Sequence, residues 1–157
     1  MPRHGLVLLA TMSERESIST VLDEVRDGLD AAARDGWSFR VVVVDDGGDP
    51  AFGDLCTRAA RERGLELSFV DGPRRGLGSA VLHGFDVALA DEQVEVVVNL
   101  DGDGQHDARQ IPGLLRAHVA DGSGLTIGSR WTKGGECHGL SRSRRVLSRA
   151  GAFALHR

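Results

Sequence analysis

Residues 41–48 read VVVVDDGG, and this stretch decides the fold class. A run of four valines has no polar position, so it suits a strand that is covered on both faces, as the strands of parallel sheets are. The two aspartates and two glycines that follow are typical of a turn. The stretch therefore predicts a central strand whose carboxyl end carries two acidic side chains.

Similar strand candidates recur along the chain, with helical patterns between them. Further apolar runs lie at 6–9, 65–70, 94–100 and, more weakly, 125–127. Apolar residues at helical spacing predict helices that begin near residues 18, 50, 76 and 111. Ser13 and Glu16 have the spacing of a capping box before the first helix. This alternation predicts an α/β fold with a mainly parallel sheet, helices on both faces and right-handed crossovers.

Length and composition agree with one domain. The 157 residues are 41% hydrophobic and 27% charged, which is enough for a buried core and unlike a disordered chain. No run approaches the roughly 18 apolar residues of a membrane span. Two cysteines, Cys56 and Cys137, exclude a disulfide scaffold. We therefore expect a protein of the cytoplasm or facing it.

Charge is unevenly distributed. Residues 1–129 hold 12 basic and 22 acidic side chains, a net charge of −10, whereas 130–157 hold 7 and 1, a net charge of +6. The basic segment is expected to contact something anionic, and the acidic body argues against nucleic-acid binding. Residues 141–157 have the pattern of a basic amphipathic helix, which would lie at a membrane surface or pack on the domain.

Two acidic pairs follow predicted strands, Asp45-Asp46 and Asp101-Gly102-Asp103. Ligands of open α/β sheets bind at the carboxyl ends of the strands. On neighbouring strand ends the two pairs would repel each other unless a cation or a donor-rich ligand lay between them. Because carboxylate oxygens suit hard cations, we expect Mg²⁺ or Mn²⁺ at Asp101 and Asp103.

An EF-hand is an alternative for the loop that begins at Asp101, and the sequence excludes it. An EF-hand needs Gly and Glu at its sixth and twelfth positions, where this chain has His106 and Pro112. Asp107 is expected to cap the next helix. The Asp45-Asp46 pair has the alternative of a turn held by an Asx hydrogen bond.

The Gly76-x-Gly78 stretch lacks the third glycine of a dinucleotide fingerprint. It is interpreted either as a turn where the backbone approaches a phosphate, with Arg74 or Arg75 nearby, or as a plain helix entry.

Taken together, the motifs resemble the family-2 inverting glycosyltransferases, and among them the dolichol-phosphate mannosyltransferase-like (polyprenyl-phosphate glycosyltransferase) group. Residues 8–18 are similar to that family's first strand and Glu-bearing loop, and residues 41–49 to its Val-Val-Asp-Asp-Gly-Ser segment. Residues 75–85 are similar to its Gly-Leu-Gly-Ser-Ala helix start, and residues 101–106 to its metal-binding loop. The pattern continues in the same order at 128–130, 134–135 and 144–149. The resemblance thus covers essentially the whole chain.

The resemblance implies a GT-A-type, Rossmann-like fold that uses Mg²⁺ or Mn²⁺. It implies that the base and ribose contact Glu14, Asp45 and Asp46, with Arg74 near the nucleotide. It assigns the metal and diphosphate to Asp101, Asp103 and Gln105. It assigns the acceptor phosphate to Arg130, Arg144 and Ser148, and it makes Asp103 and Arg130 the catalytic residues.

The implied reaction moves a hexose, with mannose favoured, from a nucleotide sugar to a polyprenyl or dolichyl phosphate, with inversion. GDP-mannose is the preferred donor and UDP-glucose the second choice. An acceptor phosphate is already largely anionic at pH 7, so it needs less help from a general base than a sugar hydroxyl would. Residues 1–129 would form the nucleotide-sugar-binding α/β domain, and 130–157 an acceptor-side segment of the same domain. The protein is expected to lie peripherally at the cytoplasmic face of the membrane and to bind no nucleic acid.

The chain also departs from the family pattern. The family's Pro-Thr-Tyr-Asn-Glu is Ala-Thr-Met-Ser-Glu at 10–14, and the Ser after Asp-Asp-Gly is Gly48. The chain ends at Arg157, before segments that the family usually has, which we interpret as a C-terminal truncation. The alternatives are a glycosyltransferase with a hydroxyl acceptor and an inactive nucleotide-sugar-binding or membrane-associated fragment.

Overall fold

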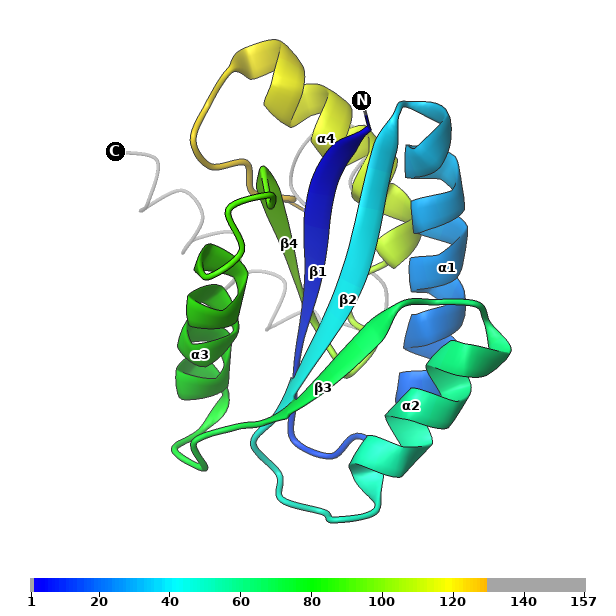
Figure 1. Cartoon of the computed structure of the whole chain (residues 1–157), viewed down its shortest axis with the longest axis vertical. Helices are drawn as coiled ribbons and strands as arrows, with labels where there is room; N and C mark the ends of the chain where they lie inside the picture. The colour runs from blue at the N-terminus through cyan, green and yellow to red at the C-terminus, as the bar shows by residue number, and fades with distance from the viewer. Residues whose placement is uncertain (1, 130–157) are drawn as a thin grey trace, which may run out of the picture.

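Residues 2–129, which the computed structural model describes, form a four-stranded parallel sheet with helices on both faces (Figure 1). In chain order the elements are β1 (Arg3–Thr11), α1 (Ile18–Arg34), β2 (Trp37–Asp45), α2 (Phe52–Glu62), β3 (Leu67–Asp71), α3 (Leu77–Leu89), β4 (Val96–Asp101), η1 (Ala108–Gln110) and α4 (Ile111–Asp121). The strand order is β3-β2-β1-β4, with every pair parallel. The predicted α/β class and parallel sheet are confirmed.

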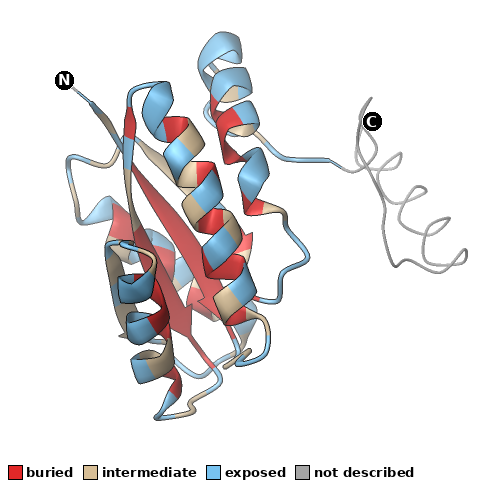
Figure 2. Cartoon of the chain, turned by 90° about the vertical axis from the view of Figure 1, so that its right-hand side faces the viewer, coloured by how far each residue is buried: buried red, intermediate tan, exposed pale blue. Residues whose placement is uncertain are grey.

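The sheet core is divided by the alternation of side chains along the strands. Odd-numbered residues of β1 and β2, such as Val7 and Val43, pack with α1, α2 and α4. Even-numbered residues, such as Leu8 and Val42, pack with α3 on the other face. Figure 2 shows the central strands as the buried layer between the helices. Valines 41–44 are at most 1% exposed, as their uninterrupted apolar run predicts.

Helix α3 lies close to the sheet because it presents small residues to it. Its buried positions are Ala80, Gly84 and Ala88. A Cβ at Gly84 would stand 2.2 Å from Leu8 Cδ1, so the helix axis can approach β1 only with glycine there. Val81 and Val87 pack partly against the same core, whereas Leu82 and Leu89 point outward and are 68% and 79% exposed.

The predicted capping box is wrong. Helix α1 starts at Ile18 with Ser17 at its N-cap, one turn later than the motif requires. Ser13 has a φ of 63° and bonds the carboxylate of Asp45 instead. A long-range partner thus outcompetes the local cap.

The predicted fifth strand is also wrong. Residues 125–127 form no strand, and Leu125 and Ile127 are 74% and 76% exposed. After the left-handed Gly122, the Thr126 hydroxyl lies 3.0 Å from His118 Nδ1 of α4. This contact ties the segment to the end of α4.

Within residues 2–129, no helix combines the length and apolar character that a membrane crossing requires. The segment 130–157, including the predicted basic amphipathic helix, lies outside the described residues.

The close packing of α1 against η1 at Gly28 can be tested by substitution. A Cβ at this buried position would stand 2.3 Å from the backbone oxygen of Ala108, which cannot rotate away. We expect Gly28→Ala to lower the free energy of unfolding in urea by about 1–3 kcal/mol, as overpacking does.

The matched control is Gly113→Ala in α4, where an added Cβ meets no atom within 4 Å. It should leave stability unchanged or raise it by up to about 1 kcal/mol, because alanine favours helix. Equal stability of the two variants would contradict the assigned contact.

Candidate functional site

The carboxyl ends of the strands lie level at one edge of the sheet. In the strand register Thr11 stands opposite Asp45, and Asp45 opposite Asp71. Asp101 at the end of β4 stands opposite Ala10. The expectation that the two acidic pairs follow neighbouring strands is wrong, because β1 takes the central place between β2 and β4. The polar end of β1 therefore separates the two pairs.

Asp45 is the most highly bonded carboxylate at this edge, and it is only 2% exposed. Its Oδ1 accepts hydrogen bonds from Thr11 Oγ1 at 2.8 Å and the Ser13 backbone N–H at 2.6 Å. Its Oδ2 accepts from Ser13 Oγ at 2.9 Å and the Gly48 backbone N–H at 3.0 Å. Four donors from two loops thus offset the cost of burying the charge.

The charge of Asp45 is also felt beneath it, by the thiol of Cys56 in α2. Cys56 is completely buried in the core between α2 and the sheet. Burial, and to a lesser degree the Asp45 carboxylate, raise the pKa of this thiol to about 12. Both effects disfavour a second negative charge in the same layer.

Asp46 fastens the loop between β3 and α3 to the end of β2. It is 6% exposed, and its two oxygens accept from the backbone N–H groups of Arg74 and Gly76. The backbone reinforces the link, because Gly72 N–H donates to the Asp45 carbonyl at 2.7 Å. The oxygens of Asp45 and Asp46 are thus bonded to the chain's own donors, and their contact with a base or ribose stays a prediction.

The loops after β1 and β2 are held together by a second set of contacts. The Arg15 guanidinium forms an ion pair with Asp49, and the Asp49 N–H donates to Ser13 Oγ at 3.2 Å. Glu14, a predicted contact of the nucleotide, is half-buried and accepts from the Met12 N–H at 2.6 Å. The Arg15 hydrogen bond, followed by the Ala51 N–H, lowers the pKa of Asp49.

The loop after β4 is packed against β1 at its first residue, Gly102, and its later polar side chains are exposed. A Cβ at Gly102 would stand 2.4 Å from Thr11 Cγ2, so the loop passes directly over the end of β1. Ser17 Oγ fixes it further by donating to the Gly102 carbonyl at 2.8 Å. Asp103 accepts from the Gln105 N–H at 2.9 Å, which is an Asx turn, and both side chains are exposed.

The same loop brings His106 next to Asp101. Its Nδ1 accepts from the Asp101 N–H at 3.3 Å and lies 3.7 Å from Asp101 Oδ2. The expected cap is confirmed, because Asp107 accepts from the Arg109 N–H at the start of η1. The sequence offered His106 as a supporting group of this loop and not as a ligand, and the tight Asp-Gly-rich loop places it beside Asp101.

The donor chemistry of this loop fits a divalent cation only in part. Asp101, Asp103 and Gln105 offer carboxylate and carboxamide oxygens, which are the ligands that Mg²⁺ and Mn²⁺ prefer. Residues 2–129 contain no group of three or more acidic, His or Cys side chains arranged to hold a metal. Such a site would need further oxygens from a ligand, as Mg²⁺ sites with substrate phosphates do.

The remaining predicted site residues fall in two groups. Arg74 lies at the carboxyl edge, exposed, with a backbone φ of 57°. Arg130, Arg144 and Ser148 lie outside the described residues. Thr11 and Ser13 were missed as organisers of the edge, although two hydroxyl residues directly after a buried strand are a usable signal.

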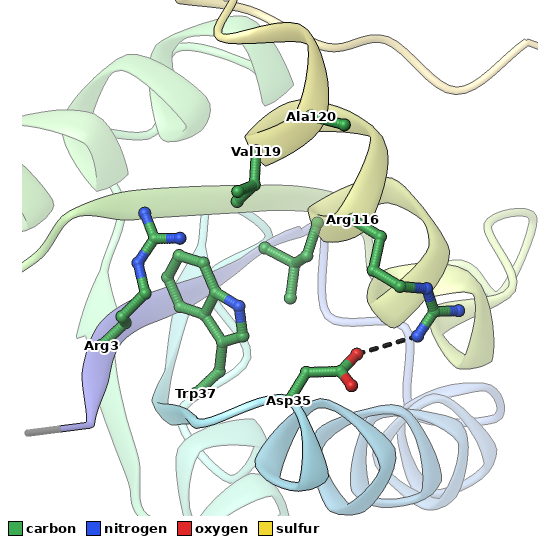
Figure 3. A pocket seen from close by; sticks show the side chains of 7 residues that line it. Arg3, Asp35, Trp37, Arg116, Val119 and Ala120 are labelled. Carbon is green, nitrogen blue, oxygen red and sulfur yellow. Dashed lines mark hydrogen bonds and ion pairs between the residues drawn. The ribbon is translucent and has the colours of Figure 1, made fainter.

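A pocket of about 240 Å³ occurs at the opposite, amino edge of the sheet (Figure 3). The Arg3 guanidinium lies 4.1 Å above the Trp37 ring and pairs with Glu95. Arg116 pairs with Asp35 at 2.8 Å, the dashed contact in Figure 3. These charged groups are paired within the chain, whereas the Asp103 and Gln105 side chains at the carboxyl edge are exposed, so that edge remains the candidate site.

Comparison with known proteins gives one family match. The profile described as "Glycosyl transferase family 2" matches residues 7–156. An undecaprenyl-phosphate mannosyltransferase of Micrococcus luteus is 34% identical over 150 residues, which are 94% of this chain and 57% of the relative.

Two further relatives have similar names. A polyprenol monophosphomannose synthase of Mycolicibacterium smegmatis is 32% identical, covering 92% of this chain and 51% of the relative. A dolichol-phosphate mannosyltransferase of Pyrococcus furiosus is 30% identical, covering 91% and 38%. The chain therefore spans about half the length of the curated relatives that it matches.

The bonding of Asp45 predicts a large loss of stability on neutralisation. In Asp45→Asn, an amide N–H₂ replaces one acceptor and faces donors that cannot bond it. We expect the free energy of unfolding to fall by about 2–4 kcal/mol in urea titrations. Asp71→Asn is the control, because Asp71 occupies the paired position on β3 but is exposed, and it should change stability by less than about 0.5 kcal/mol. Similar losses in both variants would refute the role given to Asp45.

The ion pair of Arg15 and Asp49 predicts a pH dependence. Because the pKa of Asp49 lies below its ordinary value, the pair stabilises the loops at neutral pH and this stabilisation disappears as the pH falls through that lowered pKa. In Arg15→Gln, an NMR titration of the Asp49 carboxyl carbon should show the pKa raised toward the ordinary range. Arg26→Gln removes the separate ion pair with Asp30 and should leave the titration of Asp49 unchanged. A shifted Asp49 pKa in Arg26→Gln would contradict the assignment of the effect to Arg15.

Proposed function

The chain belongs to glycosyl transferase family 2, and on that premise we propose that it takes part in the transfer of a hexose from a nucleotide sugar to a polyprenyl phosphate. The names of its relatives support mannose as the sugar and a polyprenyl phosphate as the acceptor class. Because the chain spans only about half of those relatives, the activity of a whole enzyme is itself part of the proposal.

The observation that carries the proposal is the loop after β4. It begins at the carboxyl edge of the sheet, where open α/β sheets bind ligands, and the Gly102 contacts fix its first residues against β1. Beyond that fixed start, Asp103 and Gln105 are exposed and available to a ligand.

Asp101, Asp103 and Gln105 are the residues that would hold Mg²⁺ or Mn²⁺, together with oxygens of the donor diphosphate. When bound, the cation would offset the charge that develops on the leaving nucleoside diphosphate. Asp101 is half-buried, and His106 Nδ1 lies 3.7 Å from its Oδ2.

The donor nucleotide is assigned to the loops after β1, β2 and β3. Glu14, Asp45 and Asp46 would face the base and ribose, and Arg74 the phosphates. Since Asp45 and Asp46 already bond several backbone N–H groups, their contribution includes shaping the loops around the nucleotide. GDP-mannose is the favoured donor and UDP-glucose the second choice.

The acceptor is assigned to the basic segment. Arg130, Arg144 and Ser148 would bind the phosphate of the lipid, because guanidinium groups bind phosphate through paired, charge-assisted hydrogen bonds. Arg130 and Asp103 would act as the catalytic residues in an in-line attack that inverts the anomeric carbon. The charge of +6 on 130–157 supports peripheral binding at the anionic cytoplasmic face of a membrane.

The donor half of the proposal is tested by calorimetry with GDP, GDP-mannose, UDP and UDP-glucose, each with and without Mn²⁺. We expect metal-dependent binding that weakens at least about tenfold in a double Asp101→Ala, Asp103→Ala variant, because the charged ligands are lost. A double Glu66→Ala, Asp121→Ala variant carries the same charge change on exposed residues away from this edge and should bind like the wild type. Folded protein that binds none of the four nucleotides would refute the proposal.

The acceptor half is tested with labelled donor and two lipids, undecaprenyl phosphate and the corresponding polyprenol. Label is expected on the phosphate lipid only, and Arg144→Ala should reduce its incorporation. Transfer to the alcohol would instead identify a hydroxyl acceptor.

A further inference from the structure

We propose that Gly48 and Asp46 are positioning residues for Arg74, and that the missing side chain at position 48 is what leaves the Arg74 guanidinium in place for the donor phosphates. The inference rests on the proposed function, since it concerns the same nucleotide site. It gives a physical role to a position where this chain departs from the Asp-Asp-Gly-Ser pattern that it resembles.

The backbone of Arg74 is fixed by Asp46. The Arg74 N–H donates to Asp46 Oδ1 at 2.5 Å, and the Gly76 N–H donates to Oδ2 of the same carboxylate. Arg74 has a φ of 57°, an uncommon conformation for a residue other than glycine. Asp46 thus holds the loop in a conformation that arginine alone would not favour.

The side chain of Arg74 lies over the turn after β2. A Cβ built on Gly48 would stand 2.5 Å from Arg74 Nη1, 2.9 Å from Cζ and 3.3 Å from Nη2. The contacts with Nη1 and Cζ are too short for real atoms, so any side chain at position 48 must displace the guanidinium. Because the guanidinium is the far end of a flexible side chain, its displacement costs little stability but changes where the positive charge lies.

The N–H groups of the Arg74 guanidinium have no partner in the part of the chain that the structure describes. Within residues 2–129 the guanidinium forms no ion pair and no hydrogen bond. The nearby carboxylates of Asp46 and Asp49 are bonded to other groups. An exposed cation that the fold positions but does not neutralise is suited to an anionic ligand, and the phosphates of the donor nucleotide are the anions expected at this edge.

A double-mutant cycle tests the inference, using whichever of GDP and UDP the wild-type chain binds more tightly in the presence of Mn²⁺. We expect Arg74→Ala to weaken binding about tenfold or more, because a charge-assisted contact is lost, and Gly48→Ala to weaken it about fivefold or more. In the double variant, the Gly48 substitution should cost no more than about twofold beyond Arg74→Ala, because the group that it displaces is gone.

Gly36→Ala controls for backbone strain. Gly36 has a φ of 84°, close to the 79° of Gly48, but an added Cβ there meets no atom within 4 Å and it lies at the amino edge of the sheet. Gly36→Ala and Gly48→Ala should lower the melting temperature by similar amounts, and only the latter should weaken nucleotide binding. Additive losses in the cycle would overturn the positioning role while leaving the proposed function intact. A wild-type chain that binds no nucleotide would overturn both.

Discussion

The buried carboxylate of Asp45 is the interaction on which the carboxyl edge depends. A parallel sheet brings the ends of its strands to one edge, but it does not by itself arrange the loops that follow. Asp45 does this by accepting from Thr11 at the end of β1, from Ser13 in the loop that follows, and from Gly48 after β2. Since its charge is removed from water, each of these donors has to stay in place, and the loops lose the freedom that loops usually have.

Asp46 extends the same arrangement to a third loop. Asp45, the last residue of β2, bonds Thr11 and Ser13 on the β1 side, and the next residue, Asp46, bonds the loop after β3. Two consecutive aspartates can therefore join three loops that are far apart in sequence. This is a structural reason for the Asp-Asp pair that does not require a ligand, and it is compatible with one, because the loops so joined surround the proposed nucleotide site.

The sequence predicted those features that depend on local pattern. The valine run required cover on both faces, and Asp107 capped the helix that follows it. It failed where another contact outcompeted the expected one. Ser13 has the spacing of a cap, yet Asp45 from another strand accepts its hydroxyl hydrogen bond. At 125–127 the competing contact is a local one, since Thr126 bonds His118 of the helix just before it. The position of β1 between β2 and β4 could not be predicted either, because strand order depends on the crossover connections and not on the sequence of one segment.

The buried thiol of Cys56 allows the opening of the layer between α2 and the sheet to be measured as a rate. With a pKa of about 12 and no exposed surface, its thiol is almost never a thiolate at neutral pH and cannot meet a reagent in the folded chain. Alkylation of this sulfur has to wait for α2 to part from the sheet. The rate of alkylation, measured on the peptide that contains Cys56, therefore reports how often the layer beneath Asp45 opens. It detects openings that are too rare to be seen in an equilibrium unfolding signal.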